Sequence, residues 1–367
     1  MIKIEKEYYR RLALQEEYGG TNKPINKITP LVSVVTITYQ HAPYIRQCID
    51  SILMQETEFP FELIIGEDGS TDGTREICIE YANKYPDKIR LFLRDRKLTQ
   101  YVTEDGRTVR FNGHFSRAAA RGEYIAICEG DDYWIDKHKL EKQVKILEND
   151  KYVLCSTNYY VLRNNHMQEI KKKKNEYTIR DILKSNIIAT PTVIFRSKFL
   201  PPFDPELSTL WFGDWILWIK ISQKGMIYNL KDLTSIYRVN ELSISNSTPF
   251  REKYNDIICM YQILENRYCG KYNEAITTGL SLAYCNFAIN LAYSNAKKEG
   301  LEYLTISLVK KVSSATFINQ ARALILIISK RLYVSVRRHL SLYLAYARLF
   351  NPKNIVIRIS FKSPKIF

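Results

Sequence analysis

The sequence predicts an α/β fold with a doubly wound sheet, followed by a helical C-terminal region. Short apolar segments rich in β-branched residues alternate with segments of helical periodicity, which is the pattern of strands joined by crossover helices. Loops rich in Gly, Asp, Ser and Thr follow the apolar segments. With 367 residues and 46% apolar content, the chain is long enough to bury a large core.

The predicted elements alternate along the chain in the order of such a sheet. Residues 31–40 are apolar at odd and even positions, as expected of a strand buried on both faces of a parallel sheet. Residues 44–55 carry Ile45, Ile49 and Ile52 at helical spacing and are predicted to form a helix. The next elements are a strand ahead of Glu67, a helix over 76–84, a strand over 89–93, a strand from Glu123 and a helix over 137–148.

Beyond Lys151 the pattern becomes mixed. Residues 164–176 are predicted as a polar loop, IIATPTVIF as a strand and GDWILWIKI as the start of a helix, and the chain is predicted to be helical from about Pro249. The sequence therefore divides into an N-terminal extension (1–30), an α/β domain (31–245) and a helical, basic C-terminal region (246–367).

The net charge of +15 is concentrated at the end of the chain. No Asp or Glu follows Glu302, whereas twelve Lys or Arg residues do. Without these twelve, 42 bases face 39 acids in residues 1–302, so this part is nearly neutral. The distribution argues against a nucleic-acid-binding protein and indicates a tail with a role of its own.

Two further features predict a protein of the reducing cytoplasm. The N-terminus mixes acids and bases where a signal peptide would have an apolar run, and no segment reaches about 18 apolar residues without a charge. The seven cysteines are odd in number and scattered, unlike a disulfide framework or a C-x-x-C metal site.

An acidic loop, with Glu129, Asp131 and Asp132, follows the fourth predicted strand. In open α/β sheets, ligands bind at the carboxyl ends of the strands. Acids packed together repel one another unless a hard cation neutralises them, so this loop is a candidate site for Mg²⁺ or Mn²⁺. The alternative is a solvated turn with an Asp that caps the next helix.

The acidic loop after the second strand is a candidate nucleotide site. Asp68 offers a carboxylate that can accept an N–H of a base, and Tyr39, at the end of the first strand, offers an aromatic face. Together they would hold a nucleobase between a stacking surface and an acceptor. The alternative is a turn with a helix cap supplied by Asp72 or Thr74.

Three motifs, taken together, resemble the family 2 glycosyltransferases of the GT-A fold, a Rossmann-like, doubly wound mixed sheet. The motifs are VSVVTITYQHAPYIRQCIDSILMQ, FELIIGEDGSTDGTREI and ARGEYIAICEGDDYWIDKHKLEKQV. Their order, spacing and chemistry all agree with the family over roughly residues 31–240. The resemblance makes residues 31–245 the expected catalytic domain.

The resemblance implies roles for the residues of both acidic loops. Tyr39 and Asp68 match the positions that contact uracil. Asp131 and Asp132 fall on the DXD-type motif for metal and diphosphate, and residues 117–121 lie where the family contacts the donor sugar and diphosphate. The implied donor-binding residues are Tyr39, Glu67, Asp68, Arg117 and Asp131, and the implied ligands of Mn²⁺ or Mg²⁺ are Asp132, Asp131 and Glu129, where Glu129 replaces the usual Asp.

The family's general base is an acid at the opening of a later helix. In LWFGDWILWIKISQKG the matching residue is Asp214, preceded by Gly213 where the family often has a second acid. The alternative role of Asp214 is an N-cap, which is compatible with the first because a helix start displays its carboxylate into the cleft. Tyr237-Arg238-Val239 resembles the family's Tyr-Arg-x-His element, with Asn240 in place of the His.

These roles imply an inverting transfer of sugar from a nucleoside-diphosphate sugar, with a UDP-sugar favoured, to a glycan or lipid-linked acceptor in surface polysaccharide biosynthesis. The base removes the acceptor proton while the metal offsets charge on the departing diphosphate. A metal-dependent nucleotidyltransferase and a basic nucleic-acid-binding protein are the alternatives. The first would need a Gly-rich, Lys/Arg-bearing phosphate loop after the first strand, and the second a P-loop, zinc-finger or RNP pattern; the sequence shows neither.

The tail predicts a membrane contact. Five bases recur at intervals of seven or eleven residues, which places them on about a third of a helix circumference. A basic amphipathic helix on an anionic membrane fits this pattern, and a solvated face of a helical subdomain is the alternative. We therefore expect a cytoplasmic enzyme that is peripheral on the inner face of the membrane. The five bases are Lys330, Arg331, Arg337, Arg338 and Arg348.

Overall fold

The computed structural model describes residues 1–240, 248–294 and 296–310, together with residues 316, 319–321, 323, 324 and 327. The chain forms two compact units, residues 1–276 and residues 277–367. The predicted boundary near residue 245 lies outside the described residues and stays a prediction. The five clustered bases of the tail lie outside them as well.

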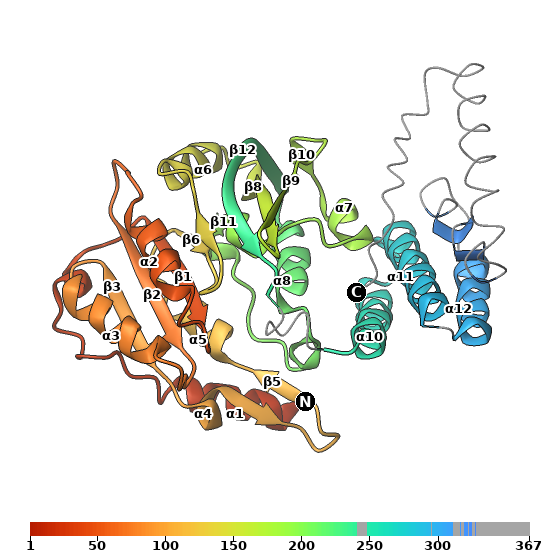
Figure 1. The fold of residues 1–367 in the computed structure, drawn as a ribbon, viewed down its shortest axis with the longest axis horizontal. Helices are drawn as coiled ribbons and strands as arrows, with labels where there is room; N and C mark the ends of the chain where they lie inside the picture. The colour runs from red at the N-terminus through yellow and green to blue at the C-terminus, as the bar shows by residue number, and fades with distance from the viewer. Residues whose placement is uncertain are drawn as a thin grey trace. The chain divides into compact units, whose positions relative to one another are not determined.

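The first unit is built on a ten-stranded mixed sheet that contains the predicted parallel strands (Figure 1). β1 lies between β2 and β6, β3 lies outside β2, and the four run parallel. Helices α2 and α3 pack on one face of these strands, where Val34, Ile49 and Cys78 share a core. The predicted α/β class is confirmed. The bounds are β1 Val32–Thr38, α2 Ile45–Leu53, β2 Phe61–Glu67, α3 Thr74–Lys84, β3 Ile89–Leu93 and β6 Tyr124–Ile127.

The remaining strands make the sheet mixed. β11 pairs antiparallel with β6 and with β8, and β12 runs parallel to β8. β7 directly follows the acidic loop and pairs with the end of β12, so two segments far apart in the sequence meet beside that loop. The bounds are β7 Tyr133–Trp134, α6 Lys139–Leu147, β8 Tyr152–Arg163, β10 Glu176–Tyr177, α7 Ile179–Lys184, β11 Ile194–Arg196, α8 Gly213–Ser222, β12 Met226–Arg238 and α10 Phe250–Tyr268.

The predicted polar loop over residues 164–176 is wrong in its first part. Residues His166–Ile170 form β9, which pairs antiparallel with β8. Asn164 and Asn165 make the turn with φ angles of 48° and 61°, a conformation that Asn tolerates better than most residues. Because β9 is exposed along nearly its whole length, its sequence lacks the apolar alternation that predicts a strand.

The N-terminal segment packs into the first unit through an aromatic cluster. Tyr8 of α1 is buried, and its ring stacks on Phe203 with centroids 4.1 Å apart. Phe111 and Phe115, on either side of the start of α5, complete the cluster. Helix α1 thereby lies against a small hairpin, β4–β5, that the chain forms between β3 and β6. The bounds are α1 Ile2–Leu12, α4 Arg96–Thr99, β4 Gln100–Val102, β5 Thr108–Arg110 and α5 Asn112–Ala118.

The second unit is helical where the structure describes it. It holds most of α11 (Asn273–Tyr293) and α12 (Lys297–Lys310), with Leu304, Ala323 and Ile327 in its core. In the described part of the chain, α11 alone is long and apolar enough to cross a membrane. The protein itself buries 72% of the most apolar window of α11, which also fits a helix in a protein core.

Candidate active site

The predicted site residues meet at one edge of the sheet. β1, β2 and β6 run parallel, with Thr38 opposite Glu67, so their carboxyl ends share an edge. Tyr39 follows β1, Asp68 follows β2, and the loop that begins near Glu129 follows β6. The Asp68 N–H donates to the Thr38 carbonyl at 3.0 Å, which keeps the ends of β1 and β2 together.

Glu129, Asp131 and Asp132 form a carboxylate cluster at this edge. One oxygen of each side chain lies within 4.8 Å of the other two. Asp132 is 1% exposed, and its Oδ1 accepts the Arg238 N–H at 2.8 Å. Its other oxygen, Oδ2, is buried and has no hydrogen-bond partner among the described residues. A largely buried acidic cluster with an unpaired carboxylate oxygen is chemically suited to a cation.

Burial and mutual repulsion shift the pKa values of the cluster. Burial raises the pKa of Glu129 to about 8, and Asp131 and Asp214 contribute to the shift. Burial also raises the pKa of Asp132 well above its usual range, and both neighbouring acids add to the effect. A divalent cation bound by the cluster would reverse these shifts, because it stabilises the ionised carboxylates.

Contacts from β1 and β12 fix the conformation of the acidic loop. A Cβ on Gly130 would lie 2.6 Å from the Thr38 Oγ1, so only glycine lets the loop pass this close to β1. Arg238 donates from Nη1 to the Asp131 carbonyl at 2.6 Å. Asn240, at the position of the family's His, donates from Nδ2 to the Asp131 Oδ2 at 2.9 Å. The substituted residue therefore contacts the acidic cluster directly.

His41 is a neighbour of the cluster that the sequence analysis did not single out. Its Nε2 lies 3.9 Å from the Asp131 Oδ2, and its Nδ1 lies 3.3 Å from the Thr38 hydroxyl. Burial lowers the pKa of His41, against the opposing effect of Asp131, and favours the neutral ring. A neutral imidazole can bind a metal or accept a hydrogen bond. Its position two residues after Tyr39, in TYQHAPY, is the signal that would have found it.

Asp214, the predicted base, lies in the first turn of α8. It is the second residue of the helix, and the N-cap residue is Phe212. The Asn186 amide donates to the Asp214 Oδ2 at 3.1 Å. Burial raises the pKa of Asp214, while the Asn186 hydrogen bond and the charge of Arg117 oppose the shift. The raised pKa makes this carboxylate a stronger base than an exposed Asp.

Arg117, near the end of α5, lies between Asp214 and the acidic cluster. Its guanidinium interacts electrostatically with both Glu129 and Asp214, and burial lowers its own pKa to about 10. The guanidinium makes no hydrogen bond with any residue that the structure describes. Its N–H groups are therefore available to an anionic ligand such as a phosphate.

The two predicted nucleobase residues lie together, with Arg96 against both. Asp68 is 7% exposed, and its Oδ1 accepts the Thr99 hydroxyl at 2.5 Å. The Arg96 guanidinium lies over the Tyr39 ring, with Cζ 3.4 Å from the ring centroid. Burial raises the pKa of Asp68, against the effects of Thr99 and Arg96. The sequence analysis missed both Arg96 and Thr99.

Glu67 holds the loop after β2. Its side chain is fully buried, with Oε1 accepting the Ser70 N–H at 2.6 Å and Oε2 paired with Arg75 at 2.5 Å. Both oxygens thus bind protein groups, which are contacts that order the loop. The predicted role of Glu67 in donor binding gains no support from them and stays a prediction.

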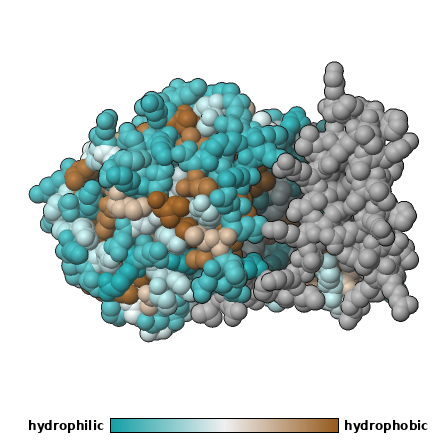
Figure 2. Space-filling model, turned by 45° about the horizontal axis from the view of Figure 1, so that its top comes forward, coloured by the Kyte–Doolittle hydropathy of each residue, from teal (hydrophilic) through white to brown (hydrophobic). Residues whose placement is uncertain are grey.

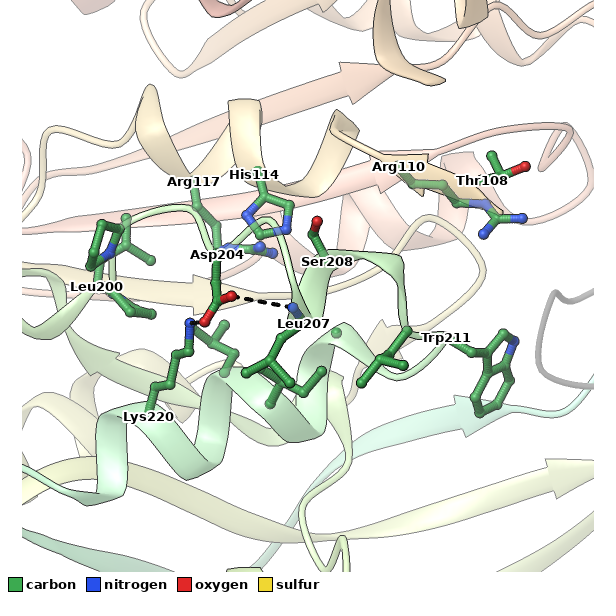
Figure 3. Close-up of a pocket in the computed structure, with 16 residues that line it drawn as sticks. Thr108, Arg110, His114, Arg117, Leu200, Asp204, Leu207, Ser208, Trp211 and Lys220 are labelled. Atoms are coloured by element: carbon green, nitrogen blue, oxygen red, sulfur yellow. Dashed lines mark hydrogen bonds and ion pairs between the residues drawn. The ribbon is translucent and has the colours of Figure 1, made fainter. Parts of the chain in front are cut away.

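A pocket borders the start of α8 (Figure 3). His114 and Arg117 of α5 line one side, and residues 200–211 with α8 line the other. Lys220 pairs with Asp204 at 2.6 Å across the lower part of the pocket. Because Gly213 lines this space, the pocket offers room for a ligand directly beside the predicted base.

The fold is that of the GT-A class of glycosyltransferases. The TarS 1-349 structure from S. aureus, solved with UDP-GlcNAc, superposes with a TM-score of 0.53 and 18% identity. The match covers 76% of this chain and 81% of that chain. At this identity the likeness shows the fold alone, and the predicted GT-A fold is confirmed.

The family follows from two comparisons. The family model described as Glycosyl transferase family 2 matches residues 33–102. The putative teichuronic acid biosynthesis glycosyltransferase TuaG of Bacillus subtilis is 30% identical over 223 residues, which are 59% of this chain and 82% of TuaG. The chain belongs to the family 2 glycosyltransferases, as the resemblance predicted.

Two further relatives differ in how much of their length is matched. WfaP of Escherichia coli, a UDP-Glc:α-D-GlcNAc-diphosphoundecaprenol β-1,3-glucosyltransferase, is 26% identical over 277 residues, 66% of this chain and 98% of WfaP. An uncharacterised protein of Mycobacterium tuberculosis is 35% identical over 212 residues, 56% of this chain. The match spans only 58% of the length of that mycobacterial protein.

Proposed function

We propose that this chain is an inverting, metal-dependent glycosyltransferase that moves a sugar from a UDP-sugar to a lipid-linked or glycan acceptor of a surface polysaccharide. The observation that carries the proposal is the largely buried cluster of Glu129, Asp131 and Asp132 near Asp214. Membership of family 2 supports sugar transfer. The cluster and the adjacent carboxylate support the metal and the inverting mechanism.

The cluster fits Mg²⁺ or Mn²⁺. Hard cations take carboxylate oxygens, and these two ions bind through few carboxylates and leave positions for phosphate oxygens. The unpaired Oδ2 of Asp132 and its raised pKa are the features that a cation would relieve. A bound cation would offset the negative charge that develops on the departing diphosphate.

The chain's own residues perform the remaining steps. Asp214 removes the proton from the acceptor hydroxyl as its oxygen attacks the anomeric carbon on the face opposite the diphosphate. A single displacement of this kind inverts that carbon. The Asn186 amide orients the Asp214 carboxylate, and Arg117 presents N–H groups to the diphosphate oxygens.

The donor binds at the ends of β1 and β2. Tyr39 stacks with the base, and Asp68 accepts its N–H. UDP is the favoured nucleotide because WfaP, which the chain matches over 98% of the WfaP length, is named as a UDP-Glc-dependent glucosyltransferase. The sugar itself points toward the acidic cluster, since the diphosphate binds there.

The acceptor enters beside α8, where the pocket of Figure 3 borders Gly213. A lipid-linked acceptor is favoured, since WfaP by its name acts on a diphosphoundecaprenol-linked sugar and TuaG is named for teichuronic acid biosynthesis. Such an acceptor places the enzyme at the cytoplasmic face of a membrane. We assign membrane attachment to the basic tail because its twelve Lys and Arg residues have no acid among them. The face shown in Figure 2 is mostly hydrophilic over the described residues, with some apolar residues among them.

The test is metal-dependent turnover of UDP-sugars. We expect release of UDP to stop in EDTA and to return with Mn²⁺ or Mg²⁺. Asp131→Asn and Asp132→Asn should each remove most turnover at unchanged melting temperature, because loss of a metal carboxylate costs several kcal/mol of transition-state stabilisation. Asp232→Asn is the matched control, since this carboxylate lies on β12 and pairs with Lys142 outside the cluster. Full activity in EDTA would contradict the metal assignment.

A further inference from the structure

A guanidinium lies on one face of Tyr39, the ring to which the proposed function gives the nucleobase. Arg96 is the first residue of α4, and its Cζ is 3.4 Å from the Tyr39 ring centroid. Cations interact favourably with an aromatic face out to about 6 Å, so this is a close contact. One face of one ring accommodates one planar group, and a base stacked there would need the volume that the guanidinium fills.

Arg96 also engages the polar partner of the base. Its Nε lies 3.7 Å from the Asp68 Oδ2. The other oxygen, Oδ1, already accepts the Thr99 hydroxyl at 2.5 Å. The oxygen that remains for an N–H of a base is therefore the one beside Arg96. A third contact comes from the side-chain amide of Gln100. In the amide orientation in which its oxygen faces Arg96, that oxygen accepts from the Arg96 Nε and Nη2 at 2.8 Å each.

We propose that Arg96 is a built-in competitor of the nucleobase and sets the affinity of the enzyme for its nucleotide. The guanidinium makes the same two contacts that a base would make, a stack on Tyr39 and a polar contact with Asp68. When the nucleotide binds, its base displaces the Arg96 guanidinium from both Tyr39 and Asp68. This inference rests on the proposed function, which assigns Tyr39 and Asp68 to the base.

The surrounding contacts indicate that the side chain moves and the backbone stays. Arg11 of α1 donates from Nη1 to the carbonyls of Lys97 at 2.9 Å and Gln100 at 2.6 Å. These bonds tie the segment after Arg96 to the N-terminal helix. The Arg96 side chain is 31% exposed, which gives the guanidinium a path into solvent without a shift of α4. Displacement of the guanidinium by a base therefore breaks only the contacts of the Arg96 side chain.

The experiment measures the binding of UDP to the full chain by calorimetry in Mg²⁺. Arg96→Ala should lower the Kd for UDP by about 3- to 30-fold, because the base no longer displaces a cation from Tyr39. Arg96→Lys should give a smaller gain, since the ammonium keeps a charge beside Asp68 but cannot stack as a plane. A merely structural role would predict the opposite sign, because a loosened site binds UDP more weakly.

Arg107→Ala is the matched control. Arg107 lies in the β4–β5 hairpin and pairs with the exposed Asp105 at 3.2 Å. Removing it changes the net charge by the same amount as Arg96→Ala, and we expect the Kd for UDP to stay unchanged. An equal gain in both variants would overturn the proposal, since it would trace the effect to overall charge.

Two negative outcomes separate this inference from the function on which it rests. If the wild type binds UDP and Arg96→Ala binds it equally or more weakly, Arg96 is not a competitor and the inference is overturned, while the proposed function stands. If neither protein binds UDP, ADP or GDP in Mg²⁺ or Mn²⁺, the proposed function itself is overturned, and the inference falls with it.

Discussion

The Asp214 carboxylate is half-buried, accepts a hydrogen bond from Asn186 and interacts with Arg117. These neighbours favour the ionised form and oppose the effect of burial, which raises the pKa of Asp214. We predict that Asp214→Asn lowers kcat on the order of 10²- to 10⁴-fold and leaves the Kd for UDP nearly unchanged, because a general base acts on the acceptor. Steady-state rates and calorimetry measure the two effects. A collapse of UDP binding in this variant would show that Asp214 serves the structure of the site.

Glu129 should make the stability of the metal-free protein depend on pH. Its pKa is raised from 4.5 to about 8 in the folded state, so between these values the native state binds more protons than the unfolded state. Stability therefore falls as pH rises through this window. Urea unfolding at several pH values should show the decline in the wild type and a flatter profile in Glu129→Gln. Mn²⁺ should restore stability at the upper end, since it binds the native state. Parallel profiles for the two proteins would contradict the assignment.

At the residue scale, the sequence identified the groups that directly follow strands. Tyr39, Asp68 and Asp131 could be placed because parallel strands bring their carboxyl ends to one edge. Arg96 and Thr99 could not be placed, since each reaches Tyr39 or Asp68 through packing between segments far apart in the sequence. The individual roles of Tyr39, Asp68 and Asp131 in catalysis and binding stay predictions.

At the element scale, the N-terminal helix α1 is a structural support for the proposed nucleotide site. Tyr8 is 6% exposed and stacks on Phe203, and α1 also binds the segment that carries Arg96. We predict that Tyr8→Ala lowers the free energy of unfolding by about 3 kcal/mol, the usual cost of removing a buried aromatic ring. Urea denaturation measures it. Tyr9→Ala is the control, because Tyr9 is 49% exposed and should cost less than about 1 kcal/mol. Equal losses would mean that the Tyr8 stack contributes little.

The elements that the sequence predicted and missed differ in physical kind. Buried parallel strands such as residues 89–93 are apolar throughout and are recognised from composition alone. The β4–β5 hairpin has strands of three residues each, too short for a periodic pattern, and β9 is exposed. Such edge elements depend on their pairing partners, and single-sequence periodicity does not report them.

At the scale of the whole molecule, the excess charge is separate in the sequence from the residues of the proposed site. Residues 1–302 are nearly neutral, and the twelve bases of the tail have no acid among them. Like charges concentrated in one segment repel one another, which an anionic surface relieves. The described part of the second unit ends in a small core with Ala323 and Ile327, just before the first of the five clustered bases.

That core decides how the membrane role of the tail should be tested. Deleting residues 320–367 would remove Ala323 and Ile327 from the core of the second unit, and loss of binding could then reflect unfolding. Substituting Gln for the five clustered bases keeps the core and removes roughly 1 kcal/mol of attraction per cation at an anionic surface. We predict that this variant leaves anionic liposomes while it hydrolyses UDP-sugars at the wild-type rate. Substituting five exposed bases of residues 1–240 is the control and should leave most binding in place, because those charges are balanced by nearby acids. Retention of the tail variant on the liposomes would show that the tail is the solvated face of a helical region.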